Sequence, residues 1–405
     1  MQSQRRFSFV FAAALATAWV VCPVAGAAES APPAASIPVK ADPILAESQA
    51  RLAWSLIEQL APASPNSINI SPASLASAFS VVALGSDPAM RQAIAKTLGF
   101  AAGDSAAAFD ALGRARAMLA AEPGALAQSA DRVVFSPDNP PSSEMQALLT
   151  QNGAPFSVED LSKPEVVAGI DAWVKQVTKG VIPEILGGPL PNSPLVVLNA
   201  LHFKGKWREA FDPKITSPSP FTGFDGKKAD VAMMRQPMAE RAYRADEKFV
   251  GVDLPFDDER FSLVVVTTRD KPAAAKDFAA ASDWLSGAKF MRQRGDLALP
   301  RFKITGRYEL LPALDAMGLA PERASPKALA GFGPGILLAQ VLQRASIEVN
   351  EEGAEAAAAT AIVAMRAVPH DESLHMVVDK PFLFALRDRA SGLILVAGYV
   401  GQPPQ

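Results

Sequence analysis

The sequence predicts a mixed α+β fold in one large domain, and three observations lead to this expectation. The 405 residues are 49% hydrophobic and 20% charged, an ordinary globular composition that allows one large core or two smaller ones. Helical spacing of apolar residues dominates up to about residue 186, and strand patterns dominate afterwards. No long polar linker separates these parts and no internal repeat is visible, so both parts are expected to pack as one α+β domain.

The helical part consists of stretches in which apolar residues recur three and four positions apart. Ser71 and Asp87 stand where the N-caps of two of these helices would fall. The stretches are 45–60, 71–85, 87–100 and 166–186.

The second part is rich in Val, Leu and Phe in short runs bounded by Gly, Pro or Asp, which is typical of strands. These runs are 193–203, 260–268, 297–304, 343–350, 373–379, 381–388 and 392–400.

The N-terminus has the pattern of a secretory signal. Two arginines, Arg5 and Arg6, precede an apolar run over 7–21 and the small residues Ala25–Ala27, so cleavage is expected after Ala27. No later apolar run reaches the roughly 20 residues that span a bilayer. The mature protein is therefore expected to be soluble and either secreted or periplasmic.

Cys22 is the only cysteine, and it lies within the signal peptide 1–27. Lipid attachment there is the alternative, but such processing needs a small residue where Val21 stands. The mature chain would then have neither a disulfide nor thiol chemistry. A Pro-rich and Ala-rich segment over 28–43 is expected to be a flexible leader before the folded domain at 44–405.

Composition argues against several function classes. With a net charge of −3 and scattered basic residues, the chain has no basic stripe for nucleic acid, and membrane surfaces are disfavoured likewise. None of the three histidines, His202, His370 and His375, has metal-ligand spacing, and no hydrolase or phosphate-binding motif is present. Glu351–Glu352 and 257–259 are interpreted as exposed acidic turns. We expect no enzyme, no metal site and no cofactor.

One stretch does not fit these ordinary patterns. Residues 351–365 are rich in alanine and favour a helix by propensity, yet Ile347 and Val349 before them alternate as in a strand, and a polar loop follows. The question is why such a stretch follows a strand.

Seven blocks of sequence, in order along nearly the whole mature chain, resemble the serpins, the secreted inhibitors of serine proteases that also include non-inhibitory members. We interpret the chain as a secreted bacterial member. The blocks are 69–85, 172–186, 195–216 with "MMRQ" at 233–236, 299–319, "VNEEGAEAAAATA" at 349–361, "DKPFLFALRD" at 379–388, and the terminal strand that ends in "GQP".

The resemblance implies a monomeric fold with three β-sheets and an exposed reactive loop near the C-terminus. In that family's scheme a target protease cleaves the loop and forms an acyl-enzyme. The freed arm then enters the central sheet as a new strand, which traps the protease.

The residues of the arm are consistent with that scheme. A strand that inserts must carry small or apolar side chains on alternate positions. Positions 354 to 364 taken in steps of two carry no charge, and the other face has a single charge, Glu355, at the end that enters first. The predicted hinge and inserting arm comprise Gly353, Ala354, Glu355, Ala356, Ala357, Ala358, Ala359 and Thr360.

Two positions compete for the reactive bond. The commonest family spacing from Gly353 places the bond between Ala367 and Val368, which suits an elastase-like protease. A loop one residue shorter would place it between Arg366 and Ala367, which suits a trypsin-like protease.

The resemblance also assigns Ser71, Ser74 and Asn199 to a polar cluster under the sheet where it must part. Gln343 stands where many members have histidine, and it can donate and accept hydrogen bonds. Trp207 matches an aromatic residue at the head of the sheet where the arm enters. A plain core role for these residues is the alternative.

The sequence is compatible with three functions to different degrees. The first is an exported suicide inhibitor. The second is a non-inhibitory member that binds or carries a partner or acts as a folding aid, although such members tend to have bulky or charged arms. The third, a secreted hydrolase, lacks a catalytic set.

Overall fold

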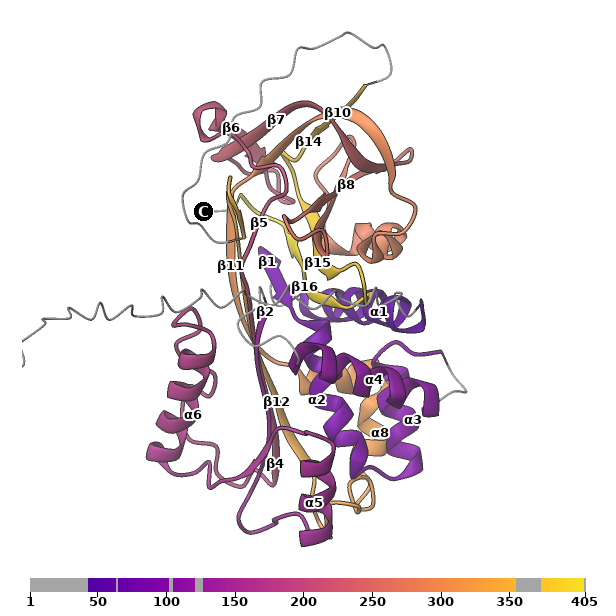
Figure 1. Ribbon diagram of the computed structural model, residues 1–405, viewed down its shortest axis with the longest axis vertical. Helices are drawn as coiled ribbons and strands as arrows, with labels where there is room; N and C mark the ends of the chain where they lie inside the picture. Colours follow the sequence, from indigo (N-terminus) through magenta and orange to yellow (C-terminus); the bar gives the residue numbers. More distant parts are fainter. Residues whose placement is uncertain (1–42, 63–64, 102–104, 121–126, 355–372, 404–405) are drawn as a thin grey trace, which may run out of the picture. The chain divides into compact units, whose positions relative to one another are not determined.

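Helices cover the N-terminal part of the protein, as predicted. The computed structural model describes residues 43–62, 65–101, 105–120, 127–354 and 373–403, and all of them belong to one unit, Val39–Gln405 (Figure 1). The signal peptide and nearly all of the predicted leader lie outside these residues. The helices are α1 (Pro43–Leu60), α2 (Pro72–Leu84), α3 (Pro88–Thr97), α4 (Ser105–Ala120), α5 (Ser143–Gln151), α6 (Pro164–Val177), α7 (Leu311–Leu314) and α8 (Ala320–Arg323).

Both predicted N-caps are confirmed. Ser71 accepts a hydrogen bond from the Ser74 backbone at the start of α2, and Asp87 accepts one from the Met90 backbone at the start of α3.

The predicted helix over 166–186 is too long, because α6 ends at Val177. Lys179 and Gly180 adopt left-handed backbone angles (φ 51° and 87°), which end the helical path. The apolar residues beyond this point, Ile182 and Ile185, are still buried, so they supply packing without helical geometry.

The described residues form three sheets, as expected from the resemblance. The largest has the strand order β1-β16-β15-β9-β8-β7-β10-β14, with β6 paired to β7. Its strands are β1 (Ser67–Ile70), β6 (Ser217–Thr222), β7 (Lys228–Ala245), β8 (Phe249–Pro255), β9 (Phe261–Thr268), β10 (Met291–Pro300), β14 (Leu374–Val377), β15 (Phe382–Asp388) and β16 (Ile394–Val400).

The second sheet has the order β11-β12-β4-β2-β3, and β13 with β5 forms a third, small sheet. The strands of these two sheets are β2 (Ala127–Phe135), β3 (Phe156–Val158), β4 (Leu195–Phe203), β5 (Gly205–Lys206), β11 (Phe302–Glu309), β12 (Leu338–Val349) and β13 (Gly353–Ala354).

Several strands escaped the sequence-based prediction. Strands β1, β2 and β3 lie within the part predicted as mostly helical, and the long strand β7 carries many charged and polar residues. Strands β1 and β3 are short, and β2 and β7 mix polar and charged residues into their sequences, so these strands depend on their neighbours for their hydrogen bonds.

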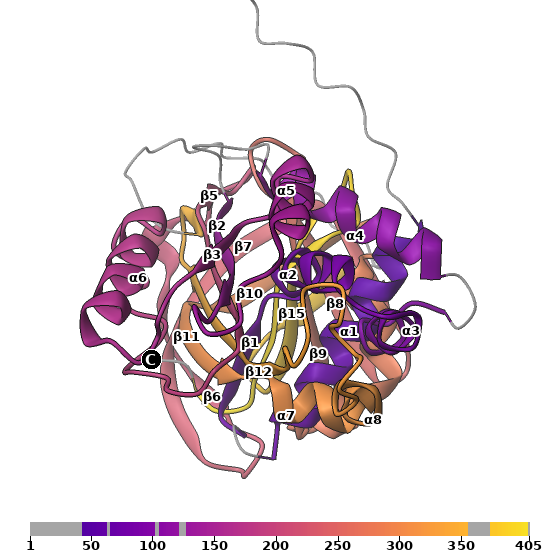
Figure 2. The same cartoon turned by 90° about the horizontal axis from the view of Figure 1, so that it is seen from below.

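The five-stranded sheet is covered on both faces, with α6 on one side and α2 on the other (Figure 1, Figure 2). On the α6 side, Val134, Val196 and Leu198 pack with buried residues of that helix. On the α2 side, Val133, Val197 and Val341 join the main core. Because neighbouring residues of a strand point to opposite faces, the odd-numbered residues of β2, β4 and β12 face α2.

Candidate functional site

Strands β4 and β12 pair directly and in parallel at the centre of the five-stranded sheet, from Leu195 opposite Leu338 to His202 opposite Ser346. We call this pair the seam. The strand pairs on either side of it, β11 with β12 and β4 with β2, are antiparallel. A strand that returned from the end of β12 by a hairpin would therefore run antiparallel to both strands of the seam.

The chain makes such a hairpin turn at the end of β12. The Asn350 backbone N–H donates to the carbonyl oxygen of Gly353 at 2.9 Å, and Asn350 Oδ1 accepts from the backbone N–H groups of Glu352 and Gly353 at 3.0 and 3.2 Å. We call residues 350–353 the hinge turn. Gly353 has a φ of 151°, and a Cβ atom on it would lie 2.0 Å from the Gly205 carbonyl oxygen, so only glycine fits.

The hinge turn directs the chain back toward the end of the seam at His202 and Ser346, which we call the head of the seam. Gly353 pairs with Lys206 and Ala354 with Gly205, antiparallel, in the small sheet of β13 and β5. Because only Lys204 separates the end of β4 from the start of β5, Gly353 and Ala354 lie beside the continuation of β4. Ala354 is fully buried there.

Trp207 holds the hinge turn from the side. Its backbone N–H donates to the Glu352 carbonyl oxygen and its indole Nε1–H donates to the Asn350 carbonyl oxygen, both at 2.8 Å. Its ring stacks on Phe256, with ring centres 4.6 Å apart. Trp207 thus lies directly after β5 and contacts the hinge turn.

Glu351 anchors the hinge turn through its side chain. The expectation of an exposed acidic turn is wrong for this residue, because it is only 5% exposed. Arg301 donates to both carboxylate oxygens at 2.6 Å, and Thr216 Oγ1 donates to Oε1 at 2.6 Å. Burial by itself would raise the pKa of Glu351, but the hydrogen bonds from Arg301 and Thr216 outweigh it, so the pKa is lowered.

The polar cluster predicted under the sheet comes together at the seam. Gln343 on β12 donates through Nε2 to Asn199 Oδ1 on β4 at 2.7 Å and to the Ser71 carbonyl oxygen at 3.0 Å. Its Oε1 accepts from the Ser71 backbone N–H at 2.8 Å. Ser71, Ser74, Asn199 and Gln343 are all fully buried. The side-chain bond between Gln343 and Asn199 crosses the seam.

One member of this network, Asp131 on β2, was not predicted from the sequence. Its Oδ1 accepts from Asn199 Nδ2 at 2.6 Å, and in the strand register Asp131, Asn199 and Gln343 lie directly opposite one another. Burial raises the pKa of Asp131 to about 7, against the opposing effect of hydrogen bonds from Ser129 and Ser77. A signal existed, because Asp131 would share one strand face with Val133 and Phe135, but that strand was not predicted.

A family model described as "Serpin (serine protease inhibitor)" matches residues 47–403. The chain belongs to the serpin family.

Characterised serpins share about a third of their aligned residues with this one. Human (Homo sapiens) Serpin B8 is 33% identical over 245 residues, which is 58% of this chain and 65% of that protein. The leukocyte elastase inhibitor of Bos taurus is 33% identical over 264 residues, 61% of this chain and 69% of that protein.

Solved serpin structures share the fold. Serpin48, described as a highly specific serpin of the insect Tenebrio molitor, has a TM-score of 0.77 at 23% identity and covers 89% of this chain and 98% of its own. A thyroxine-binding globulin complex with thyroxine has a TM-score of 0.74 at 21% identity, covering 89% of this chain and 99% of its own.

Most of this serpin's predicted arm and its reactive bond lie outside the described residues. These are Glu355, Ala356, Ala357, Ala358, Ala359, Thr360, Arg366, Ala367 and Val368. Only Gly353 and Ala354 of the arm are described, so the site rests on the hinge turn, the seam and the cluster beneath it.

Ser373, His375 and Asp296 contact one another in the Ser–His–Asp sequence of a catalytic triad. This group was not predicted from the sequence. His375 Nδ1 lies 2.9 Å from Asp296 Oδ2, and Ser373 Oγ lies 3.5 Å from His375 Nε2. The last distance is long, and the side chains of His375 and Asp296 are 64% and 45% exposed. Acyl transfer needs a dry, preorganised site, so we assign no chemistry to this group.

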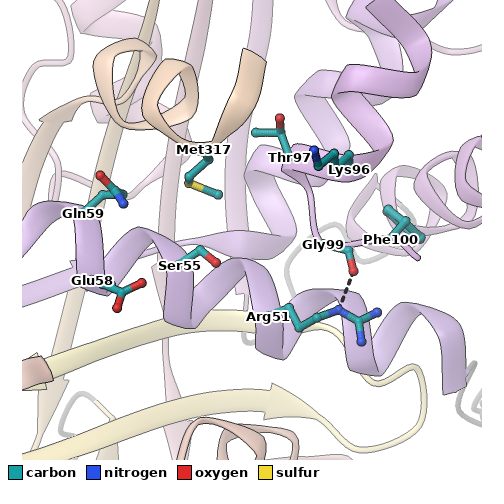
Figure 3. Close-up of a pocket in the computed structure, with 9 residues that line it drawn as sticks. All are labelled: Arg51, Ser55, Glu58, Gln59, Lys96, Thr97, Gly99, Phe100 and Met317. Atoms are coloured by element: carbon teal, nitrogen blue, oxygen red, sulfur yellow. Dashed lines mark hydrogen bonds between the residues drawn. The ribbon is translucent and has the colours of Figure 1, made fainter. Parts of the chain in front are cut away.

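A pocket of about 350 Å³ lies between α1, the end of α3 and Met317 (Figure 3). It includes none of the predicted site residues. Arg51 Nε donates to the Gly99 carbonyl oxygen beside it at 2.6 Å, and its charges are of both signs, from Arg51, Lys96 and Glu58. Mixed charges on an open rim do not select a ligand class. Among the described helices, none is long and apolar enough to cross a bilayer.

Proposed function

We propose that this serpin is an exported suicide inhibitor of serine proteases with elastase-like or trypsin-like specificity. The protease's catalytic serine attacks the carbonyl carbon of Ala367, or of Arg366 in the alternative. The bond to the next residue breaks, and the protease is left esterified to the arm. The arm, residues 353–367, then inserts into the seam between β4 and β12 and carries the protease with it.

The observation that supports this proposal best is the agreement between two registers. Extending the antiparallel pairing of β13 with β5 by whole residue pairs would set Ala356 opposite Phe203 and Thr360 opposite Asn199. Extending the hinge turn from its Asn350–Gly353 bond would set Thr360 opposite Gln343 on β12. Asn199 and Gln343 already face each other across the seam. One inserted strand therefore fits both neighbours without a shift.

The same register places one face of the arm against the main core. Ala354, Ala356 and Ala358 would face α2 and the main core, beside the buried residues Phe203 and Leu201. Thr360 would reach the cluster, where its hydroxyl can bond to the amides of Asn199 and Gln343 once they separate. Small side chains at these positions let the strand pass, whereas a buried charge would cost several kcal/mol.

Insertion also has a sufficient driving force. A dozen ladder hydrogen bonds at about 1 kcal/mol net each give a sum comparable with the stability of a whole domain. The form before cleavage is therefore a kinetic trap. The hinge turn and the β13–β5 pair hold the start of the arm at the head of the seam, where insertion begins.

Incubation with elastase and with trypsin tests the proposal. We expect an SDS-resistant complex with one of them, and N-terminal sequencing of the released C-terminal peptide identifies the bait residue. Thr360→Arg should be cleaved without forming the complex, because its charge would have to enter the seam. Thr360→Ala, with a small uncharged side chain, is the matched control and should still form it.

The melting temperature before and after loop cleavage is the second measurement. We expect a sharp rise, because the inserted strand adds its hydrogen bonds to the sheet. If neither protease forms a complex and cleavage leaves the melting temperature unchanged, the chain is instead a non-inhibitory member that binds or carries a partner.

A further inference from the structure

Among the described residues of the network under the seam, one is ionisable: Asp131, which is itself half-buried. Alternation along β2 places Asp131 on the α2 side with Val133 and Phe135, whereas Arg132 points to the α6 side, where its guanidinium lies 3.8 Å from the ring centre of Trp173. The Asp131 carboxyl is directed at Asn199 on β4 and Ser77 on α2, and both of these are buried.

Asn199 links this carboxyl to the other side of the seam. Its Nδ2 donates to Asp131 at 2.6 Å, while its Oδ1 accepts from Gln343 Nε2 at 2.7 Å. Gln343 in turn bonds to the backbone of Ser71 at the start of α2. One amide thus ties β2, β4 and β12 together, and the carboxyl fixes its orientation because it accepts the amide N–H.

The described groups around the carboxyl are neutral. Ser77 of helix α2 and Ser129 of β2 form hydrogen bonds with the carboxyl, and Ser129 in turn bonds to Ser74 of α2. Strand β4 contributes Asn199. The charged and titratable residues of these elements lie elsewhere. Arg132, its ion-pair partner Glu159 next to β3, and His202 lie on the α6 side, and Asp110 and Arg114 of α4 are exposed.

We propose that the protonation state of Asp131 controls how readily the seam opens, so that the closed sheet is held most firmly in acid and opens more easily once the carboxyl is ionised. The claim concerns opening of the sheet in the uncut chain, and it rests on the proposed function only for its effect on inhibition.

The direction follows from proton linkage. In the closed sheet, burial raises the pKa of Asp131 from 3.8 to about 7, whereas an open seam admits water and returns the pKa toward its ordinary value. Between these two values the closed form binds more protons than the open form. Opening therefore becomes easier as pH rises through this range, by at most about tenfold per pH unit, and levels off above it.

Asp131→Asn is the variant that isolates this effect. Its amide oxygen can accept from Asn199 as the protonated acid does, and it cannot ionise. The measurement is amide hydrogen exchange in β4 and β12 of the full uncut chain between pH 5.5 and 8.5, corrected for the intrinsic chemical rate. We expect the opening constant of the natural chain to rise toward tenfold per unit up to about pH 7, and that of Asp131→Asn to stay flat.

Asp258→Asn is the matched control. Burial also raises the pKa of this carboxyl, but it lies in the turn between β8 and β9, so the variant should keep the pH profile of the natural chain. The histidines are present in the natural chain and in both variants, so their contribution to the pH dependence cancels in the comparison. A pH profile in Asp131→Asn equal to that of the natural chain overturns the proposal.

A direct titration avoids dependence on the variant's folding. With ¹³C-labelled aspartate carboxyl groups in the natural chain, we expect one resonance to titrate near pH 7, and the absence of such a resonance overturns the proposal. Neither experiment uses a protease. If the chain formed no protease complex but kept the exchange profile, only the proposed function would fall.

Discussion

Glu351 illustrates at the level of one residue how the hinge is fixed. A carboxylate that is 5% exposed is tolerated because Arg301 and Thr216 satisfy both of its oxygens. A charged pair of this kind is weak evidence for net stability, but removing one partner is costly because the other loses its compensation. Glu351 therefore holds the turn in place rather than adding much to overall stability.

Replacing this carboxylate tests that role. Glu351→Gln should lower the unfolding free energy at pH 7 by about 1 to 3 kcal/mol, since charge-assisted bonds to Arg301 are lost. Because the folded pKa of Glu351 is lowered from 4.5, its stabilisation is present above that value and disappears as pH falls through the folded pKa. Urea denaturation at pH 7 and pH 4 should therefore show a smaller difference between variant and natural chain at the lower pH.

Glu348→Gln is the control for this prediction. It removes the same charge three residues earlier, from an exposed pair with Lys303 at 2.7 Å, and such pairs contribute 1 kcal/mol or less. An equal loss of stability in both variants would show that the buried position has no special role.

At the level of elements, the hinge turn and the β13–β5 pair would decide where the proposed arm starts. The turn depends on Asn350, whose side chain closes it, and on Gly353, which faces the Gly205 carbonyl too closely for any side chain. The pairing of two residues then sets the register that we extended through the seam. Small changes in the turn should therefore alter the placement of the whole arm.

Gly353→Ala tests the close approach. Its Cβ would collide with the Gly205 carbonyl oxygen, so the β13–β5 pair should separate at a cost of about 1 to 3 kcal/mol. The melting temperature should fall, and the Ala354 amide should exchange faster.

Gly113→Ala provides the opposite control, because that glycine lies within α4 and an added Cβ would meet no described atom within 4 Å. It should raise stability by up to about 1 kcal/mol through helix propensity. A Gly353→Ala variant as stable as the natural chain would mean that the turn has other conformations available.

At the level of the whole molecule, the closed seam and the proposed inserted form are two arrangements of one sequence. The closed sheet pairs β4 with β12 directly and leaves the ladder bonds of a sixth strand unmade. A native state with a higher free energy than an alternative form persists only because a barrier separates the two. Here that barrier includes the opening of the seam and of the polar cluster beneath it.

Calorimetry at different heating rates tests this kinetic trap. The apparent melting temperature of the uncut chain should fall by a few degrees when the heating rate is reduced tenfold, because slower heating allows more time to cross the barrier. The cleaved chain should melt higher. A midpoint for the uncut chain that is independent of heating rate would indicate ordinary reversible unfolding.

Local sequence was sufficient for the helices with clear caps and for the apolar strands. Ser71 and Asp87 predicted two helix starts, and β4, β9, β15 and β16 stood out as runs of Val, Leu and Phe. Strands such as β2 and β7 were missed because they mix polar residues into their pattern. They are strands because their neighbours complete their hydrogen bonds, and a local window does not contain that information.

The sequence by itself determined the α+β class, the serpin resemblance and an arm with one uncharged face. Only the tertiary structure decided that Glu351 is buried, that Asp131 joins the cluster and that Asn199 and Gln343 face each other across the seam. Each of these depends on strands that are far apart along the chain and meet only in the folded sheet. Burial, pKa and strand register depend on contacts between these distant strands, and the order of residues alone does not specify those contacts.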